Sequence, residues 1–146
     1  MKIKLELNNK EKAPVKKPYL QKISKITLAK CGIEFLAEKN ISFSVAFVSE
    51  KEIKKINRIY RKKNVSTDVL SFSEYGKKEE MEKEAELFLG EIVMCYNYIK
   101  KYAREKNMDT KNEVANVFSH GILHLLGFRH SQKMFFIQKE VVNSIK

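Results

Sequence analysis

The chain has 146 residues, of which 43% are hydrophobic and 10% aromatic, a composition typical of one modest globular domain rather than of a disordered tail. Apolar runs such as Val45–Val48 and Met134–Ile137 are far shorter than the roughly 20 residues that a membrane-spanning helix needs. We therefore expect no membrane partner. The first ten residues mix charged and apolar side chains and lack the apolar core of a secretory signal, which predicts a cytoplasmic protein.

The charge is strongly positive, at +11 from 29 basic and 18 acidic residues. The segment Glu74–Glu86 holds six of the acidic residues and three of the basic ones, so the basic excess lies outside it. Such a charge favours polyanionic partners, including RNA, DNA and anionic lipid, although a Lys-rich composition also serves solubility. The two cysteines, Cys31 and Cys95, lie far apart in apolar surroundings, which predicts buried thiols and no disulfide.

The N-terminal third alternates strand and helix patterns. Ile3–Leu7 places apolar residues at every second position and predicts a half-buried strand. From Tyr19 to about Leu36, apolar residues recur at helical spacing, with Gly32 a weak point near the end of the predicted helix. Ile41–Phe47 alternates again and predicts a second strand, rich in residues that favour β-structure.

The middle of the chain continues this alternation. Ser49 and Glu52 form a capping box, which predicts a helix that ends at a basic cluster. Residues 67–72 are β-branched and apolar and predict a third strand, and residues 88–95 predict a fourth, with Gly90 at a bulge. The acidic segment between these two strands is expected to be a loop or a frayed helix.

Three further helices are predicted toward the C-terminal end. Residues 96–107 form a basic amphipathic pattern, and Thr110 with Glu113 forms a second capping box ahead of a helix over residues 111–126. The last helix begins near Ser131. No internal repeat and no linker divides the sequence, so a single domain is expected over its whole length.

All three histidines lie within eleven residues, at His120, His124 and His130. His120 and His124 are four positions apart on the predicted helix and project from one face, as two ligands of one ion require. Gly127 ends that helix and can turn the chain back, so that His130 reaches the same point. Three neutral nitrogen ligands with one open position describe a catalytic zinc site, whereas a lone helix histidine is more often a packed core residue.

The histidine spacing HxxxHxxGxxH is shared with the metzincin zinc peptidases, so a peptidase has to be considered. Those enzymes need a glutamate directly after the first histidine, where it acts as the general base toward the zinc-bound water. This chain has Gly121 at that position, and glycine has no side chain that accepts a proton. The sequence therefore argues against a peptidase.

Three stretches resemble the YbeY family of bacterial endoribonucleases and rRNA maturation factors. They are the histidine run HGILHLLGFRH, residues 57–72 (NRIYRKKNVSTDVLSF) and residues 89–95 (LGEIVMC), in the order and spacing of the family. The resemblance implies an α+β fold with a small, four-stranded mixed sheet flanked by about five helices. It also implies a Zn²⁺ ion on three histidines and hydrolysis of single-stranded RNA, in maturation of the 16S rRNA 3′ end and in ribosome quality control. The expected partners are the 16S rRNA precursor and the ribosome or its proteins.

The resemblance also assigns roles by position. The three histidines of the motif bind the metal, and Arg61 is the functional arginine beside it. An arginine fork suits the anionic oxygens of a phosphodiester, although basic residues at a helix end also stabilise the helix dipole. The candidate RNA contacts are Arg58, Lys62 and Lys63.

Two features leave the chemistry open. Arg129 precedes the third histidine where the family has Asp, so either a partner of an imidazole is lost or the arginine points outward and contacts phosphate. No general base is evident, and Glu91 is the one acidic residue considered; metal-bound hydroxide or the RNA 2′-hydroxyl can supply the nucleophile. The alternatives to an endoribonuclease are a non-catalytic ribosome assembly factor with a structural metal and a zinc hydrolase acting on peptides or small molecules.

Overall fold

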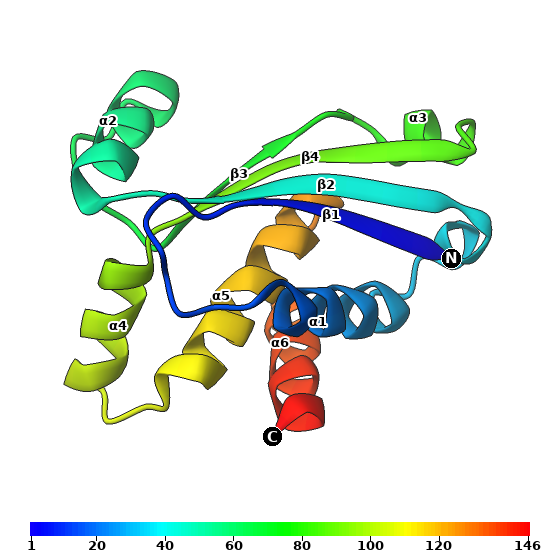
Figure 1. Cartoon of the computed structure of the whole chain (residues 1–146). Helices are drawn as coiled ribbons and strands as arrows, with labels where there is room; N and C mark the ends of the chain where they lie inside the picture. Colours follow the sequence, from blue (N-terminus) through cyan, green and yellow to red (C-terminus); the bar gives the residue numbers. More distant parts are fainter.

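Four strands form one mixed sheet in a computed structural model that describes residues 1–146 (Figure 1). The strands are β1 (Lys2–Asn8), β2 (Asn40–Phe47), β3 (Val69–Ser73) and β4 (Glu86–Met94). They lie side by side in the order β1-β2-β4-β3, with β1 parallel to β2, β2 parallel to β4, and β3 antiparallel to β4. The structure confirms the predicted four-stranded mixed sheet and places β3 at its edge.

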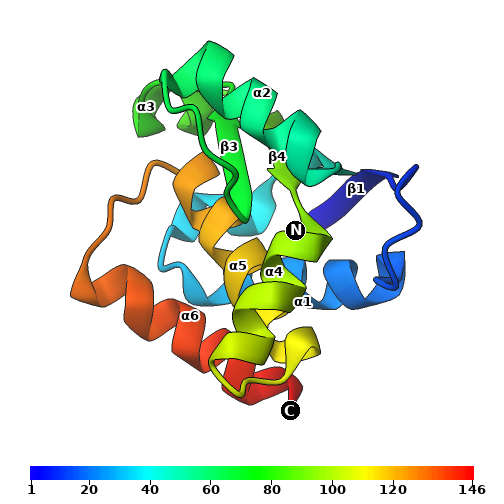
Figure 2. The ribbon, with the colours of Figure 1, turned by 90° about the vertical axis from the view of Figure 1, so that its left-hand side faces the viewer.

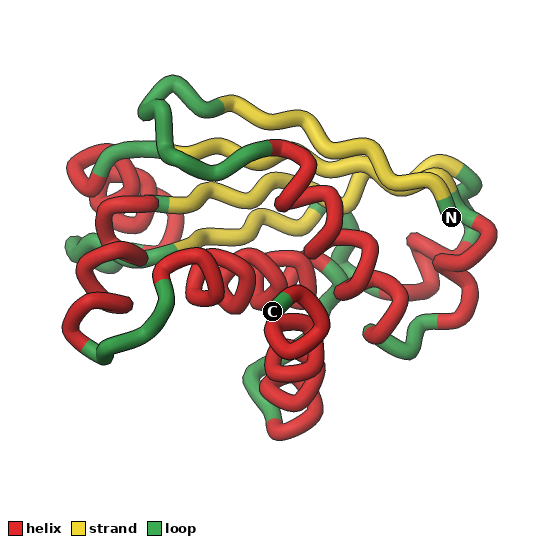
Figure 3. Tube along the Cα trace, turned by 60° about the horizontal axis from the view of Figure 1, so that its bottom comes forward, coloured by secondary structure: helices red, strands yellow, loops and turns green.

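Most of the helices form a layer on one face of this sheet (Figure 1). The helices are α1 (Lys17–Lys30), α2 (Glu50–Arg61), α3 (Lys78–Glu82), α4 (Tyr96–Glu105), α5 (Thr110–Leu125) and α6 (Gln132–Ile145), with a 3-10 helix, η1, at Glu34–Glu38. Helices α1, α5 and α6 lie below the sheet, and α2 lies above it near one end (Figures 1 and 2). Figure 3 looks onto the helical side and shows these helices in front of the four strands. None of the helices combines the length and the apolar character that a membrane-spanning segment requires.

Helix α5 lies at the centre of the core because almost all of its surface is apolar. Ten of its 16 residues are buried, and the exposed and partly exposed ones are in its first turn, at Asn116 and at the two histidines. Phe118 of α5 contacts Phe43 of β2 with ring centroids 6.1 Å apart, in a cluster of 28 buried hydrophobic residues. Cys31 and Cys95 are buried free thiols, as predicted. A histidine on this helix is thus held by a packed framework.

Two predicted helix boundaries are wrong. The first helix ends at Lys30 and not near Leu36, because Gly32 adopts φ +79° and breaks the hydrogen-bonded ladder before η1 begins. The capping box at Thr110 does not form. Asp109 caps α5 instead, its side chain accepting a hydrogen bond from the Asn112 backbone N–H at 3.0 Å. The acidic segment before β4, expected to be a loop or a frayed helix, contains the short helix α3.

Other local predictions are confirmed. The side chain of Ser49 accepts from the Glu52 N–H at the start of α2, and Ser131 likewise caps α6. Gly90 lies in a bulge, where the pairing of β2 with β4 shifts by one residue. It adopts φ +136°, a conformation that L side chains rarely adopt.

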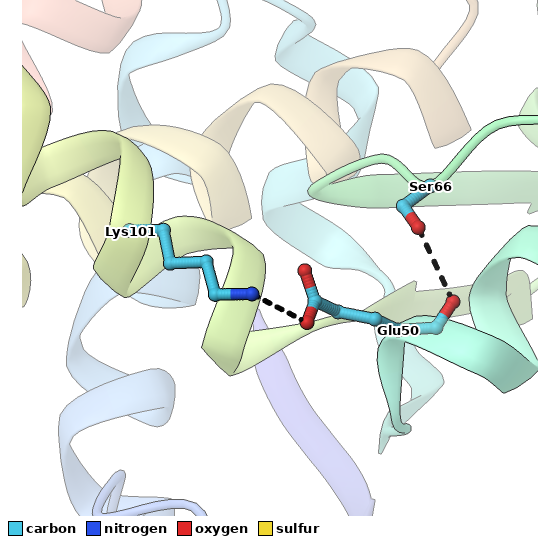
Figure 4. Close-up of polar contacts among 3 residues, drawn as sticks. All are labelled: Glu50, Ser66 and Lys101. Atoms are coloured by element: carbon cyan, nitrogen blue, oxygen red, sulfur yellow. Dashed lines mark hydrogen bonds and ion pairs between the residues drawn. The ribbon is translucent and has the colours of Figure 1, made fainter.

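The loop between α2 and β3 is fixed to the rest of the fold through Glu50 (Figure 4). Ser66 of this loop donates a hydrogen bond to the Glu50 carbonyl oxygen at 3.4 Å, and Lys101 of α4 pairs with the Glu50 carboxylate at 2.8 Å. That pair is the only salt bridge in the structure. Nearly all of the 29 basic residues therefore have no carboxylate partner.

Candidate functional site

The three histidine rings converge on one point. His120 and His124 lie on α5, and His130 lies on the loop after Gly127, whose φ of +91° reverses the chain at the helix end. The Nε2 atoms are 2.9 Å apart for His120 and His124, 3.2 Å for His120 and His130, and 3.3 Å for His124 and His130. A tetrahedral ion with nitrogen bonds of about 2.0–2.1 Å separates its ligands by about 3.3–3.4 Å, so the cluster is close to the geometry of three ligands on one ion.

The hydrogen bonds of His124 show which nitrogen carries the proton. Its Nδ1 lies 2.9 Å from the Phe128 carbonyl oxygen, which only accepts, so Nδ1 is the donor and Nε2 presents a lone pair to the other two rings. Lone pairs at this separation repel one another unless a cation lies between them. The donor set fits a metal ion for this reason, and imidazole nitrogens suit zinc and several other transition metals.

A chain of buried amides orients His120 in the same way. Gln138 of α6 donates its Nε2 hydrogens to the carbonyl oxygen and the Oδ1 of Asn116, at 3.3 and 2.9 Å. The Gln138 Oε1 atom therefore faces His120 and accepts from its Nδ1 at 3.1 Å. Asn116 in turn donates to Glu113 at 2.9 Å. Both Gln138 and Glu113 are less than 5% exposed, so this chain fixes the ring orientation and leaves Nε2 of His120 free for an ion.

Replacing Gln138 with leucine is expected to weaken metal binding about 10- to 100-fold, because His120 loses the acceptor that fixes its tautomer. Affinity is measured by competition against a chromophoric chelator. The matched control is Gln138→Glu, which keeps an oxygen facing Nδ1 and should retain most of the wild-type affinity. Equal affinities for wild type and both variants contradict a role for Gln138 in orienting the ring.

The surroundings also shift the protonation of the cluster. Burial lowers the pKa of His120 and of His124 below the ordinary histidine value, and the neighbouring rings lower both further. Both imidazoles are thereby held in the neutral form that binds a metal. Burial has the opposite effect on an acid and raises the pKa of Glu113, against the hydrogen bond from Asn116.

Replacing Glu113 with glutamine is expected to raise the free energy of unfolding of the metal-free protein relative to wild type. The gain should be roughly 1 kcal/mol larger at pH 8 than at pH 4. The pKa of Glu113 is higher in the folded protein than in the unfolded chain. Its contribution to the free energy of unfolding is therefore fully present below the unfolded pKa. That contribution is lost as the pH rises through the folded pKa, because the buried carboxyl group must then ionise. Glutamine keeps a hydrogen-bonding oxygen and does not titrate. Urea unfolding at both pH values measures the difference. The exposed control Glu105→Gln should show no such trend, and a pH-independent effect of Glu113→Gln contradicts the prediction.

A cleft of about 840 Å³ opens over the histidines, between the end of α2, the loop after it and strand β3. Arg61 and Lys63 line it, and so does Asp68, its only carboxylate. The Arg61 guanidinium donates to the Ser71 carbonyl oxygen and lies 5.2 Å from the centre of the Phe72 ring. These two contacts hold the guanidinium on the wall of the cleft.

The other basic candidates lie elsewhere. Arg58 lines a separate depression on the outer side of α2 with several lysines, and Lys62, at φ 58°, ends the helix and does not line the cleft. Glu91 also lies in a different depression, between β1, β2 and β4, so the structure does not support it as a base at the histidines. Arg129 is exposed.

Strand β3 binds α5 through its serines. Ser71 Oγ donates to the Gly121 carbonyl oxygen at 3.1 Å, and Ser73 Oγ donates to that of His124 at 3.2 Å. The helix approaches the sheet so closely that a Cβ on Gly121 would lie 3.2 Å from Ile92. A glutamate at this position would meet the sheet and not the cleft, which gives a structural reason against the peptidase interpretation.

Sequence reasoning missed Gln138, Asn116 and Asp68. Gln138 had a detectable signal, because it occupies a core position of α6 between the buried residues Ile137 and Val141, where an unpaired amide is costly. Asp68 directly precedes β3, and the strand pattern of residues 67–72 does not indicate that its carboxylate lines the cleft. Nothing in the sequence indicates that Asn116 meets α6.

Comparison with known proteins identifies the family. The family "Endoribonuclease YbeY" matches residues 6–146. The chain belongs to the YbeY family. An endoribonuclease YbeY from Ureaplasma urealyticum is 36% identical over 87% of this chain and 81% of its own, and one from Mycoplasmopsis synoviae is 38% identical over 77% and 75%. A solution structure from Thermotoga maritima superposes with a TM-score of 0.66 and 29% identity, covering 98% of this chain and 88% of that one.

Membership in the YbeY family confirms the resemblance found in the sequence motifs. Its members carry the name of an endoribonuclease, so this chain is an enzyme of the nuclease class within the hydrolases. The three-histidine group that can hold a metal ion is consistent with this class.

Proposed function

We propose that residues 1–146 form one zinc-dependent endoribonuclease domain, which cleaves single-stranded RNA in 16S rRNA 3′-end maturation and in ribosome quality control. The observation that carries the proposal is the convergence of three histidine Nε2 atoms in a cleft that Arg61 and Lys63 also line. Family membership supports RNA as the substrate and rRNA processing as the process. The 16S rRNA precursor and the ribosome or its proteins are the proposed partners, in the cytoplasm.

His120, His124 and His130 are the proposed metal ligands. Three nitrogen ligands from the protein favour a catalytic zinc site over a structural one, in which four protein ligands surround the ion. A Zn²⁺ ion held by these histidines would supply a Lewis acid for a phosphoryl oxygen and would lower the pKa of a bound water toward 7. The cleft that the histidines line has a volume of about 840 Å³, which leaves room for a phosphodiester.

The chain's own residues supply the remaining chemistry. Arg61 presents a fixed, permanently charged fork that stabilises the negative charge growing on the phosphate oxygens. Lys63 attracts the neighbouring phosphate, and Arg58 and Lys62 extend the basic surface along α2 outside the cleft. Asp68 is the one carboxylate of the cleft and accepts the proton of the attacking water or RNA 2′-hydroxyl group. As the new P–O bond forms, the P–O bond to the leaving sugar breaks, and that sugar oxygen takes a proton from solvent.

The test is cleavage of single-stranded RNA by protein stripped with a chelator and reloaded with Zn²⁺. The proposal predicts no cleavage without metal, recovery on reloading, preference over duplex RNA, and a steep loss of cleavage as salt increases. Metal bound at one equivalent with no cleavage of any RNA supports the non-catalytic assembly factor instead. Turnover of peptides that is insensitive to salt supports the third interpretation, a hydrolase for other substrates.

Replacing Arg61 with alanine is expected to lower kcat about 100-fold without loss of metal or of fold, since one preorganised charge donor is removed. Cleavage of a labelled single-stranded RNA gives kcat, and the bound metal is measured in the same samples. Arg58→Ala is the matched control, because it removes the same charge from the same helix outside the cleft. Equal losses in the two variants indicate a general charge effect and contradict a specific role for Arg61.

A further inference from the structure

Two large aromatic side chains are exposed at the start of α6, beside the metal centre. Phe135 is 55% exposed and Phe136 is 63% exposed, whereas their neighbours Met134 and Ile137 are buried. The Phe135 ring is parallel to the His130 ring within 6°, with the ring centroids 6.3 Å apart. Phe136 is one position further along the helix and projects about 100° away from Phe135. Only Phe135 therefore continues the surface of the histidine cluster.

Three cations lie close to the loop that carries the third histidine, two of them at the Phe128 ring. The Lys133 and Lys78 ammonium groups lie 5.6 and 5.5 Å from the centre of the Phe128 ring, just before the third histidine, and Arg129 is exposed next to it. None of these cations has a carboxylate partner within salt-bridge distance, because the only salt bridge joins Lys101 to Glu50. Unpaired cations beside an exposed aromatic ring are the two components of a surface that binds single-stranded nucleic acid.

We propose that Phe135 is a stacking platform for one nucleobase of single-stranded RNA, next to the metal centre, with Lys133 and Arg129 contacting the adjoining phosphates. This inference rests on the proposed function and adds a path for the strand, from Arg61 on one wall of the cleft across the histidines to α6. In a duplex both faces of each base are stacked on neighbouring bases, so no base can stack on Phe135. The platform therefore explains a preference of the enzyme for single strands.

RNA is the occupant that these residues favour over a protein. A protein interface centred on Phe135 would share the histidine edge of the cleft and block the substrate, whereas a nucleobase is part of the substrate. The high net charge of +11 also favours a polyanion, and neither Lys133 nor Arg129 forms a salt bridge within the chain.

The experiment measures the dissociation constant of a fluorescein-labelled single-stranded RNA dodecamer by anisotropy, on the zinc-loaded protein at low temperature. Phe135→Leu is expected to weaken binding about 5- to 150-fold, the range measured for one stacked base. Phe135→Tyr should bind like wild type, because it keeps the ring. Phe136→Leu is the matched control with similar exposure and should leave binding unchanged. Binding of a duplex of the same sequence should be equal in all four proteins.

A second series locates the stacked base. Abasic sites are placed one at a time along the dodecamer, and one position should weaken wild-type binding while having no further effect on Phe135→Leu. Unchanged binding by Phe135→Leu overturns the proposal, and so does an equal loss for single strands and duplex. The outcome is separate from the proposed function: RNA binding that depends on Phe135 without any cleavage supports the platform and refutes the nuclease, and normal cleavage with normal binding by Phe135→Leu refutes the platform alone.

Discussion

Replacing His124 with alanine is expected to abolish metal binding and RNA cleavage together. His124 Nε2 lies within 3.3 Å of both other histidine nitrogens, so its loss leaves two ligands and opens the centre to water. The affinity should fall by more than the 10- to 100-fold typical for loss of an outer partner such as Gln138. The measurements are the metal content after gel filtration, the competition affinity, and cleavage of single-stranded RNA.

The variant also loses the hydrogen bond from His124 to the Phe128 carbonyl oxygen, so its fold needs an independent check. Circular dichroism and the unfolding midpoint of metal-free protein should remain close to those of metal-free wild type, because the side chain is only partly buried. His124→Ala protein that still holds one equivalent of metal at wild-type affinity would refute the three-histidine centre.

Replacing Gly90 with alanine is expected to lower the free energy of unfolding by more than about 4 kcal/mol, which places it among the most damaging single substitutions. A Cβ at this position would lie 2.0 Å from the Phe72 carbonyl oxygen, a backbone atom of the paired strand that cannot move without breaking the β3–β4 ladder. The φ of +136° adds strain for any L side chain. Urea unfolding measures the loss.

Gly32→Ala is the control that separates the effect of the close contact between Cβ and the Phe72 carbonyl oxygen from the effect of the positive φ. Gly32 also has a positive φ, at +79°, but no atom lies within 4 Å of a Cβ built there. Its substitution should therefore cost only about 1 kcal/mol. If the two alanine variants are equally stable, the close contact at Gly90 is relieved by movement of the edge strand, and the prediction fails.

The order of strands and helices was predictable from the sequence because apolar residues recur at every second position in the strands and at every third or fourth position in the helices. The alternation from Ile41 to Phe47 and the capping residue Ser49 both lead to elements that the structure contains. The errors arise where two residues compete for one role. Asp109 and Thr110 are both competent caps, and only the path of the chain after α4 selects Asp109. The end of α1 likewise depends on whether Gly32 adopts a positive φ, which the sequence permits but does not require.

From residue spacing alone, the candidate site was predictable only where its residues are close in sequence, and Arg61 was assigned to it through the family resemblance. The histidines lie on one helix and the turn after it, so their spacing indicates a common ion. The partners that orient them belong to other elements: Gln138 reaches His120 from α6, and Asp68 enters the cleft from the loop before β3. Such contacts depend on how the helices and loops pack against one another, and the spacing of apolar residues along the sequence does not predict them.

The positions of Arg61 and of the histidine helix α5 both depend on the register in which the edge strand β3 pairs with β4. Ser71 contacts Arg61 through its carbonyl oxygen and α5 through its hydroxyl group, while Leu70 and Phe72 point to the opposite side of the sheet. A slip of one residue against β4 would exchange these two sides, so the guanidinium and the histidine helix would lose their common anchor in the same event. Variants that keep the length and the pairing of β3 should therefore retain both contacts, whereas a change of strand length should lose both.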